Sequence, residues 1–141
     1  MSRAFMKERE DAPEPRIVAR RTEPFPITAA GLTRLRAEAA AATVPERRAL
    51  LEEQLALAVV PPLPADRSVV DFGARVRVDS VGSPAEEFTI VGDDEVDIKS
   101  GKIGVTSPLA AALIGKRAGG SAVWHRPLGD RRLRIRAVSY D

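Results

Sequence analysis

The sequence predicts an α+β protein in which a short antiparallel helical hairpin precedes a five-stranded antiparallel sheet with one short helix. Apolar residues recur with a helical period in the first half of the chain and with a period of two in the second half. Three prolines between these halves stop any helix that reaches them. We therefore expect a disordered tail over residues 1–26, the hairpin over 27–60, a linker over 61–68 and the sheet domain over 69–141.

The composition excludes several classes of function. The 141 residues include no cysteine and one histidine, His125. A disulfide framework, a thiolate metal site and a histidine-rich metal site are therefore excluded, and we expect no metal and no cofactor. No apolar run is long enough to span a bilayer and the N-terminus lacks a signal peptide pattern, so we expect a cytoplasmic protein without a membrane partner.

The tail over residues 1–26 combines both signs of charge with Pro13 and Pro15 and has no apolar period. Such a segment cannot bury enough apolar surface to offset the entropy lost on ordering. We therefore expect it to be disordered.

Two adjacent helices are predicted between residues 27 and 60. Thr28 is suited to cap the first, whose apolar positions follow a helical period. Thr43 and Glu46 have the spacing of a capping box, and Pro45 is tolerated in the first turn of the second helix, which we expect to reach about Val59. With almost no loop between them the helices must be antiparallel, and about 15 residues give each arm a length of about 22 Å.

Alternating apolar and basic residues predict the strands of the sheet domain. We expect strands at residues 74–78, 87–91, 102–106, 121–126 and 133–137, and a short helix at 109–114. The alternation directs one set of side chains into the core: Val76, Val78, Ile90, Val105, Leu133 and Ile135. It directs a second set to the opposite, solvated face: Arg75, Arg77, Arg134 and Arg136.

The order of these parts, together with three segments of the sheet domain, resembles the bacterial GreA/GreB family of transcript-cleavage factors. The segments are VDFGARV at residues 70–76, FTIVGDDEVD at 88–97 and IGVTSPLA at 103–110. The resemblance implies an FKBP-like C-terminal domain that docks on RNA polymerase at the rim of its secondary channel. It also implies a coiled coil that enters the channel, where acidic residues at its tip help to hold a catalytic magnesium ion. The polymerase itself then cleaves backtracked RNA, and the factor alone is not an enzyme.

The hairpin departs from the family at its tip. The connection between the helices, residues 41–45, contains no acidic residue, and the capping box accounts for Glu46, the nearest carboxylate. An arm of about 22 Å is also shorter than the family's coiled coil. We therefore expect a truncated coiled coil that does not stimulate cleavage.

Two sets of residues are candidates for contact with a partner, and none is a candidate for catalysis. Thr106, Ser107, Pro108 and Leu109 match the family segment that meets the polymerase. Asp93, Asp94, Glu95 and Asp97 form an acidic turn that could contact a partner, although a solvated turn is the more common explanation of such a run. His125 follows Trp124 on a strand, and alternation predicts an exposed imidazole without a partner.

The expected function is that of a monomeric RNA polymerase-binding regulator of elongation. The alternative is an interaction module resembling the nucleoside diphosphate kinase regulators, which share the truncated layout. A prolyl isomerase is suggested only by the FKBP-like fold, which by itself does not confer function. A weak contact between the outward arginines and nucleic acid, including DNA, is a further alternative.

Overall fold

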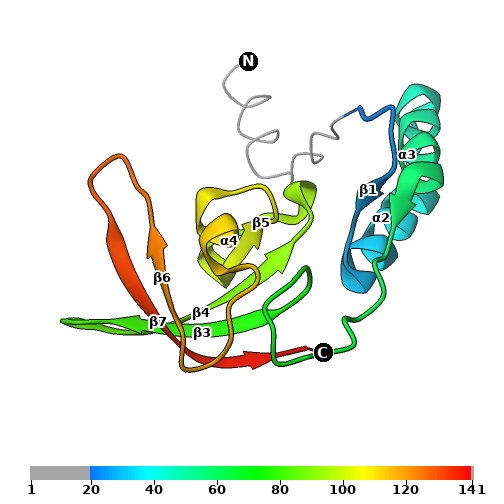
Figure 1. Ribbon diagram of the computed structural model, residues 1–141. Helices are drawn as coiled ribbons and strands as arrows, with labels where there is room; N and C mark the ends of the chain where they lie inside the picture. The colour runs from blue at the N-terminus through cyan, green and yellow to red at the C-terminus, as the bar shows by residue number, and fades with distance from the viewer. Residues whose placement is uncertain (1–19, 141) are drawn as a thin grey trace, which may run out of the picture.

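The computed structural model describes residues 20–140 (Figure 1). Most of the expected disordered tail therefore lies outside the described residues. The helices are α2 (Ala29–Ala41), α3 (Pro45–Leu57) and α4 (Pro108–Leu113). The strands are β1 (Phe25–Pro26), β2 (Ala58–Val59), β3 (Arg75–Ser80), β4 (Ser83–Val91), β5 (Lys102–Gly104), β6 (Ser121–Trp124) and β7 (Arg131–Ser139).

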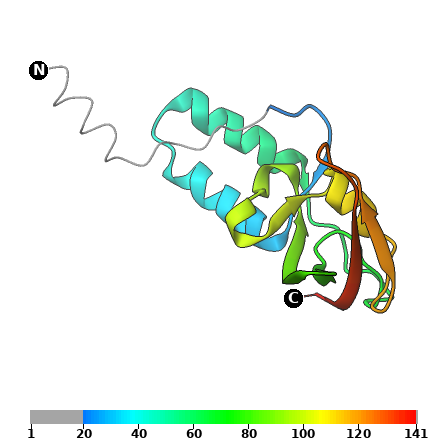
Figure 2. The same ribbon diagram turned by 90° about the vertical axis from the view of Figure 1, so that its left-hand side faces the viewer.

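Helices α2 and α3 form the expected antiparallel hairpin, with the turn between them far from the sheet (Figure 2). Thr28 caps α2 as predicted, because its hydroxyl accepts a hydrogen bond from the Gly31 amide at 3.0 Å. The predicted capping box at Thr43 is wrong. Pro45 restricts the residue before it to extended backbone, so Val44 is the N-cap of α3 and makes no side-chain capping bond.

Residues 20–26, which the sequence analysis assigned to a disordered tail, pack along the hairpin. Strand β1 pairs in parallel with β2, just after α3, and the Ile27 amide donates to the Val59 carbonyl at 2.9 Å. The side chain of Gln54, only 1% exposed, hydrogen-bonds the backbone amide and carbonyl of Arg21 at 3.2 and 3.3 Å. These contacts satisfy backbone groups that a disordered segment would leave to water.

The sheet domain contains five strands in the order β5-β4-β3-β7-β6. All neighbouring strands are antiparallel except β4 and β5, which run parallel, so the sheet is mixed. The expected α+β fold class, a hairpin followed by a five-stranded FKBP-like sheet with one short helix, is confirmed, but the sheet was expected to be antiparallel throughout and contains one parallel pair. The register shifts between Arg77 and Val78, where β7 contributes an extra residue to the pairing with β3.

Two hydrophobic cores stabilise the chain. The hairpin core includes Leu35 and Leu51, and Leu51 is fully buried. The larger core lies between α4 and one face of the sheet and is built from Val76, Val78, Ile90, Leu109, Leu113, Leu133 and Ile135. Among residues 20–140, no helix is long and apolar enough to cross a membrane.

Candidate functional site

The two sets of candidate residues lie next to each other. Asp93 opens a short 3₁₀ turn (Asp93–Glu95) between β4 and β5, and Thr106 lies between β5 and α4. The Thr106 hydroxyl donates a hydrogen bond to the Asp93 carboxylate at 2.9 Å, and the Thr106 amide donates to it at 3.3 Å. The acidic turn therefore holds the segment that leads into α4.

The start of α4 is an exposed and well-supported turn. The Ser107 hydroxyl accepts a hydrogen bond from the Ala110 amide at 3.2 Å, and Pro108 takes the first helical position, where its missing amide proton costs nothing. Leu109 is different, because it is only 4% exposed and belongs to the large core. We therefore correct the candidate set, since Leu109 is not available to a partner.

A shallow groove continues from Pro108 along α4. Its apolar wall is formed by Pro108, Ala111, Ala112 and Ile114 from the helix side and by Val123 from β6, and its volume is about 570 Å³. Val123 is 38% exposed, although it is apolar. The exposed surface around the candidate docking segment is therefore largely aliphatic.

Contacts within the chain occupy most of the acidic turn. Glu95 is buried, and its carboxylate accepts hydrogen bonds from the Gly92 amide at 2.8 Å and the Thr28 amide at 3.0 Å, together with one from the Thr28 hydroxyl. Asp94 pairs with the Arg21 guanidinium, which also lies 4.3 Å from the centre of the Phe25 ring. The acidic turn thus connects the sheet domain to the base of the hairpin.

Asp97 remains at the surface and is held locally. Its carboxylate accepts a hydrogen bond from the Ser100 hydroxyl at 2.7 Å. This bond favours the ionised form and lowers the pKa of Asp97 below its ordinary value. Among residues 20–140, no group of three or more histidine, aspartate or glutamate side chains could hold a metal ion.

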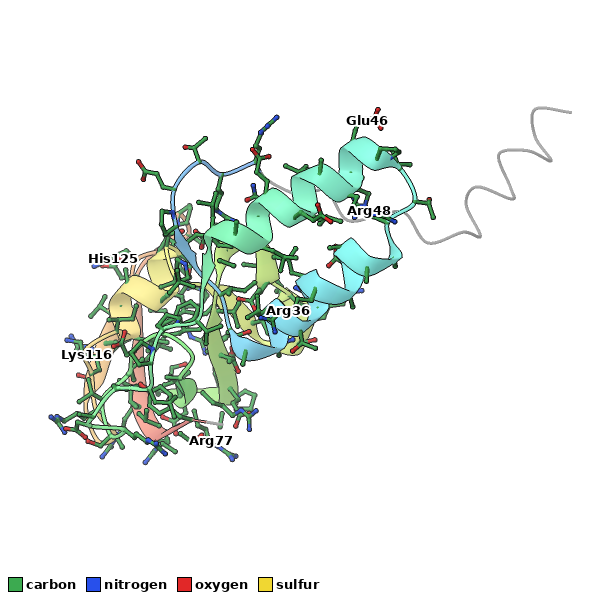
Figure 3. The ribbon with its side chains drawn as sticks, turned by 90° about the vertical axis from the view of Figure 1, so that its right-hand side faces the viewer. Arg36, Glu46, Arg48, Arg77, Lys116 and His125 are labelled. Atoms are coloured by element: carbon green, nitrogen blue, oxygen red, sulfur yellow. The ribbon has the colours of Figure 1, made fainter. Side chains whose placement is uncertain are left out.

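The tip of the hairpin contains one carboxylate, and it lies on α3. Glu46 is exposed in the first turn of α3 and points away from the body of the protein (Figure 3). The carbonyl of Ala42, at the end of α2, accepts hydrogen bonds from the Arg48 guanidinium at 2.6 and 3.1 Å. The connection itself presents Val44, which is 53% exposed.

His125 is exposed as expected, but the prediction that it lacks a partner is wrong. Its Nδ1 lies 2.9 Å from the Asp130 carboxylate across the turn between β6 and β7. The contacts of Arg21 and Gln54 with the hairpin and the turn were also missed. The role of Gln54 could have been suspected from the sequence, because a polar residue at this position interrupts the apolar positions of α3.

Comparisons with known proteins agree with this architecture. The family model described as "Transcription elongation factor, GreA/GreB, C-term" matches residues 65–140. The chain is 45% identical over 95 residues to transcription elongation factor GreA of Ralstonia nicotianae, covering 64% of this chain and 59% of that protein. It is 47% identical over 74 residues to GreA of Hyphomonas neptunium, covering 52% of this chain and 47% of that one.

The solved structure of a GreA/GreB elongation factor from Nitrosomonas europaea is also similar. It is 28% identical, with a TM-score of 0.48, and the match covers 84% of this chain and all of that one. The matched region spans only part of the two GreA proteins: 59% of the length of the Ralstonia nicotianae protein and 47% of the Hyphomonas neptunium protein.

Proposed function

The chain belongs to the GreA/GreB family of transcription elongation factors, and from this premise we propose that it binds RNA polymerase near the secondary channel and regulates elongation. The observation that carries the proposal is the start of α4. By the resemblance, Thr106, Ser107 and Pro108 match the family segment that meets the polymerase, and hydrogen bonds from the Thr106 and Ala110 amides hold this turn in place. The polymerase performs all chemistry, and this chain acts by binding.

The docking surface is the exposed part of the α4 start and the groove beside it. Pro108 and Ala111 are exposed, whereas the hydroxyls of Thr106 and Ser107 are already engaged within the chain. Apolar contact with Pro108, Ala111 and Val123 therefore supplies most of the affinity, and the capping bonds keep the surface in one conformation. A rigid surface loses little entropy on binding.

Docking through this surface does not stimulate transcript cleavage. Each helix of the hairpin has 13 residues, or about 20 Å at 1.5 Å per residue. A magnesium ligand must lie within about 2.1 Å of the ion, and the residues between the helices contain no carboxylate. The hairpin instead occupies space at the channel entrance, where it excludes longer factors that share the docking surface.

A binding assay with core RNA polymerase tests the docking. We expect micromolar or tighter binding, which Ala111→Arg weakens by at least about tenfold because the new side chain fills the groove. Ala85→Arg is the matched control, since Ala85 is exposed on β4 outside the groove, and it should bind like the parent chain. The docking proposal fails if the parent chain does not bind or if both variants bind equally well.

A cleavage assay on backtracked transcription complexes tests the proposal that docking does not stimulate transcript cleavage. The chain should leave cleavage at the level of the polymerase alone, and it should reduce cleavage by an added full-length GreA. Val44→Asp, which places a carboxylate at the tip, should not restore cleavage because the arm is too short. Cleavage above background with the parent chain would contradict this part while leaving the docking intact.

The alternative, a module similar to the nucleoside diphosphate kinase regulators, rests on the same shortened hairpin. It predicts no displacement of full-length GreA from the polymerase. The competition arm of the cleavage assay therefore distinguishes the two functions.

A further inference from the structure

One face of the sheet carries a group of arginines that polymerase docking does not use. Strand β7 directs Leu133 and Ile135 into the core, so the residues that alternate with them point to the opposite face. The neighbouring strand β3 adds two more arginines on that face. We call this group the outer arginine face, and it consists of Arg75, Arg77, Arg132, Arg134 and Arg136.

The charges on this face are only partly neutralised. The Arg136 guanidinium pairs with Asp79 at 2.5 Å, and that of Arg75 lies 3.6 Å from Glu87. Within residues 20–140, Arg77, Arg132 and Arg134 have no hydrogen-bond or ion-pair partner, and all three are exposed. Figure 3 shows the Arg77 side chain extending away from the body of the protein. The face therefore carries an excess of three positive charges.

The arginines border a hollow in the surface. A concavity of about 1140 Å³ is lined by Arg132, Arg134 and Arg136 together with residues from the ends of β3 and β4. Of the two other carboxylates that line it, Glu86 pairs with Arg131, and Asp130 lies 2.9 Å from the His125 Nδ1 atom. Successive outward residues of a strand lie about 6.8 Å apart, so β7 presents a row of guanidinium groups along the hollow. Guanidinium groups bind phosphate oxygens in a bidentate manner.

Among residues 20–140, no aromatic residue lies on this face. The larger core buries or packs against Phe72, Phe88, Trp124 and Tyr140, and Phe25 belongs to the hairpin core. Proteins that bind single-stranded nucleic acid stack bases on aromatic side chains, whereas a duplex presents its phosphates outward and needs only cations. The composition of the face therefore favours a duplex.

We propose that the outer arginine face binds the phosphodiester backbone of duplex DNA without reading the base sequence. Helix α4 packs on the opposite face of the sheet, as the ribbon shows (Figure 1). Pro108 and Ala111 of the surface proposed for polymerase docking lie on the α4 side, whereas Val123 pairs with Arg132 across β6 and β7 and shares its face. The two surfaces therefore meet only at β6, and DNA binding does not depend on the polymerase.

Fluorescence anisotropy with a labelled mixed-sequence duplex and no polymerase tests this proposal. Binding should be weak at physiological salt, with a dissociation constant of about 10⁻⁴ to 10⁻⁶ M, and should weaken steeply as salt rises. The double variant R132Q/R134Q should bind roughly tenfold more weakly, because two phosphate contacts are lost. The slope of the logarithm of the binding constant against the logarithm of the salt concentration should also fall by about two. R77Q, on the neighbouring strand, should reduce the slope by about one.

The control is R36Q/R67Q, which removes the same charge from exposed positions on α2 and in the linker. Thermal melting of each variant confirms folding, and R77Q tests the face independently if the double variant is unstable. Equal weakening in R36Q/R67Q would overturn the proposal, because it would show an effect of net charge alone. A flat salt response, tighter binding to a single strand, or equal competition by polyglutamate would each overturn it as well.

Discussion

The Glu95 carboxylate in the sheet domain accepts a hydrogen bond at 3.0 Å from the backbone amide of Thr28, the N-cap of α2. The Thr28 hydroxyl donates to the same carboxylate, and the Gly92 amide donates to it at 2.8 Å. A carboxylate at a helix N-terminus also interacts favourably with the helix dipole. This buried carboxylate of the acidic turn therefore joins the base of the hairpin to the sheet domain.

We expect Glu95→Ala to lower the free energy of unfolding by about 3 kcal/mol, because it leaves buried donors without an acceptor. Urea denaturation followed by circular dichroism measures this change. The control is Glu87→Ala, since Glu87 is half exposed and lies 3.6 Å from Arg75. It should change the free energy of unfolding by less than about 0.5 kcal/mol. Equal effects of the two substitutions would show that Glu95 does not hold the hairpin.

The close packing of Gly31 against Glu95 gives a second prediction. A Cβ atom on Gly31 would lie 2.0 Å from the Glu95 Oε1 atom and 2.9 Å from Ile27. Gly31→Ala should therefore destabilise the protein, although alanine favours a helix by about 1 kcal/mol over glycine. Thr33→Ala, at an exposed position of α2, should be neutral or slightly stabilising. A higher melting temperature for Gly31→Ala would contradict the packing.

Local patterns in the sequence predicted most of the fold. Thr28 and Ser107 each predicted the start of a helix correctly. A cap can be predicted locally because its hydrogen bond joins residues only three positions apart. The alternation around Leu133 and Ile135 predicted both the strand and its buried face. The second helix ends at Leu57 instead of about Val59 because Ala58 and Val59 pair with β1. Contacts of that kind leave no local pattern.

The candidate site was predicted less completely for the same reason. The Ser107-Pro108 turn follows from local chemistry, whereas the bond between Glu95 and Thr28 joins residues 67 positions apart. A run of acidic residues is usually solvated, so nothing in the run marked Glu95 as buried. Leu109 was a candidate because it matches the family segment that meets the polymerase, but the helix turns its side chain into the core.

The ion pair between Arg21 and Asp94 gives a third prediction. Both side chains are about three quarters buried, and the guanidinium makes two contacts with the carboxylate. A double-mutant cycle with Arg21→Ala and Asp94→Ala should give a coupling free energy of about 1 kcal/mol. The cycle subtracts the separate contact of Arg21 with Phe25.

The pair Arg20 and Glu53 is the control for this cycle, because it joins neighbouring elements but is mostly exposed. Its coupling free energy should lie near zero. If the two cycles gave the same value, the Arg21 pair would contribute no more than an ordinary surface contact. The placement of residues 20–26 would then rest on Gln54 and the β1–β2 pairing alone.

The fourth prediction concerns pH. The hydrogen bond from Ser100 lowers the pKa of Asp97, and a bond from Ser68 lowers the pKa of Asp66 in the same way. A carboxyl group whose pKa is lower in the folded state stabilises that state above its unfolded pKa of about 3.9. The stabilisation is lost as the pH falls through the lower, folded pKa.

Ser100→Ala should therefore raise the pKa of Asp97 toward its ordinary value and leave that of Asp66 unchanged. Carboxyl carbon NMR titration of the full chain measures both groups in one experiment, so Asp66 is an internal control. The variant should also lose less stability than the parent chain between neutral and acidic pH, because the pKa of Asp97 then differs less between the folded and unfolded states. An unchanged titration of Asp97 would show that Ser100 does not hold this end of the acidic turn in solution.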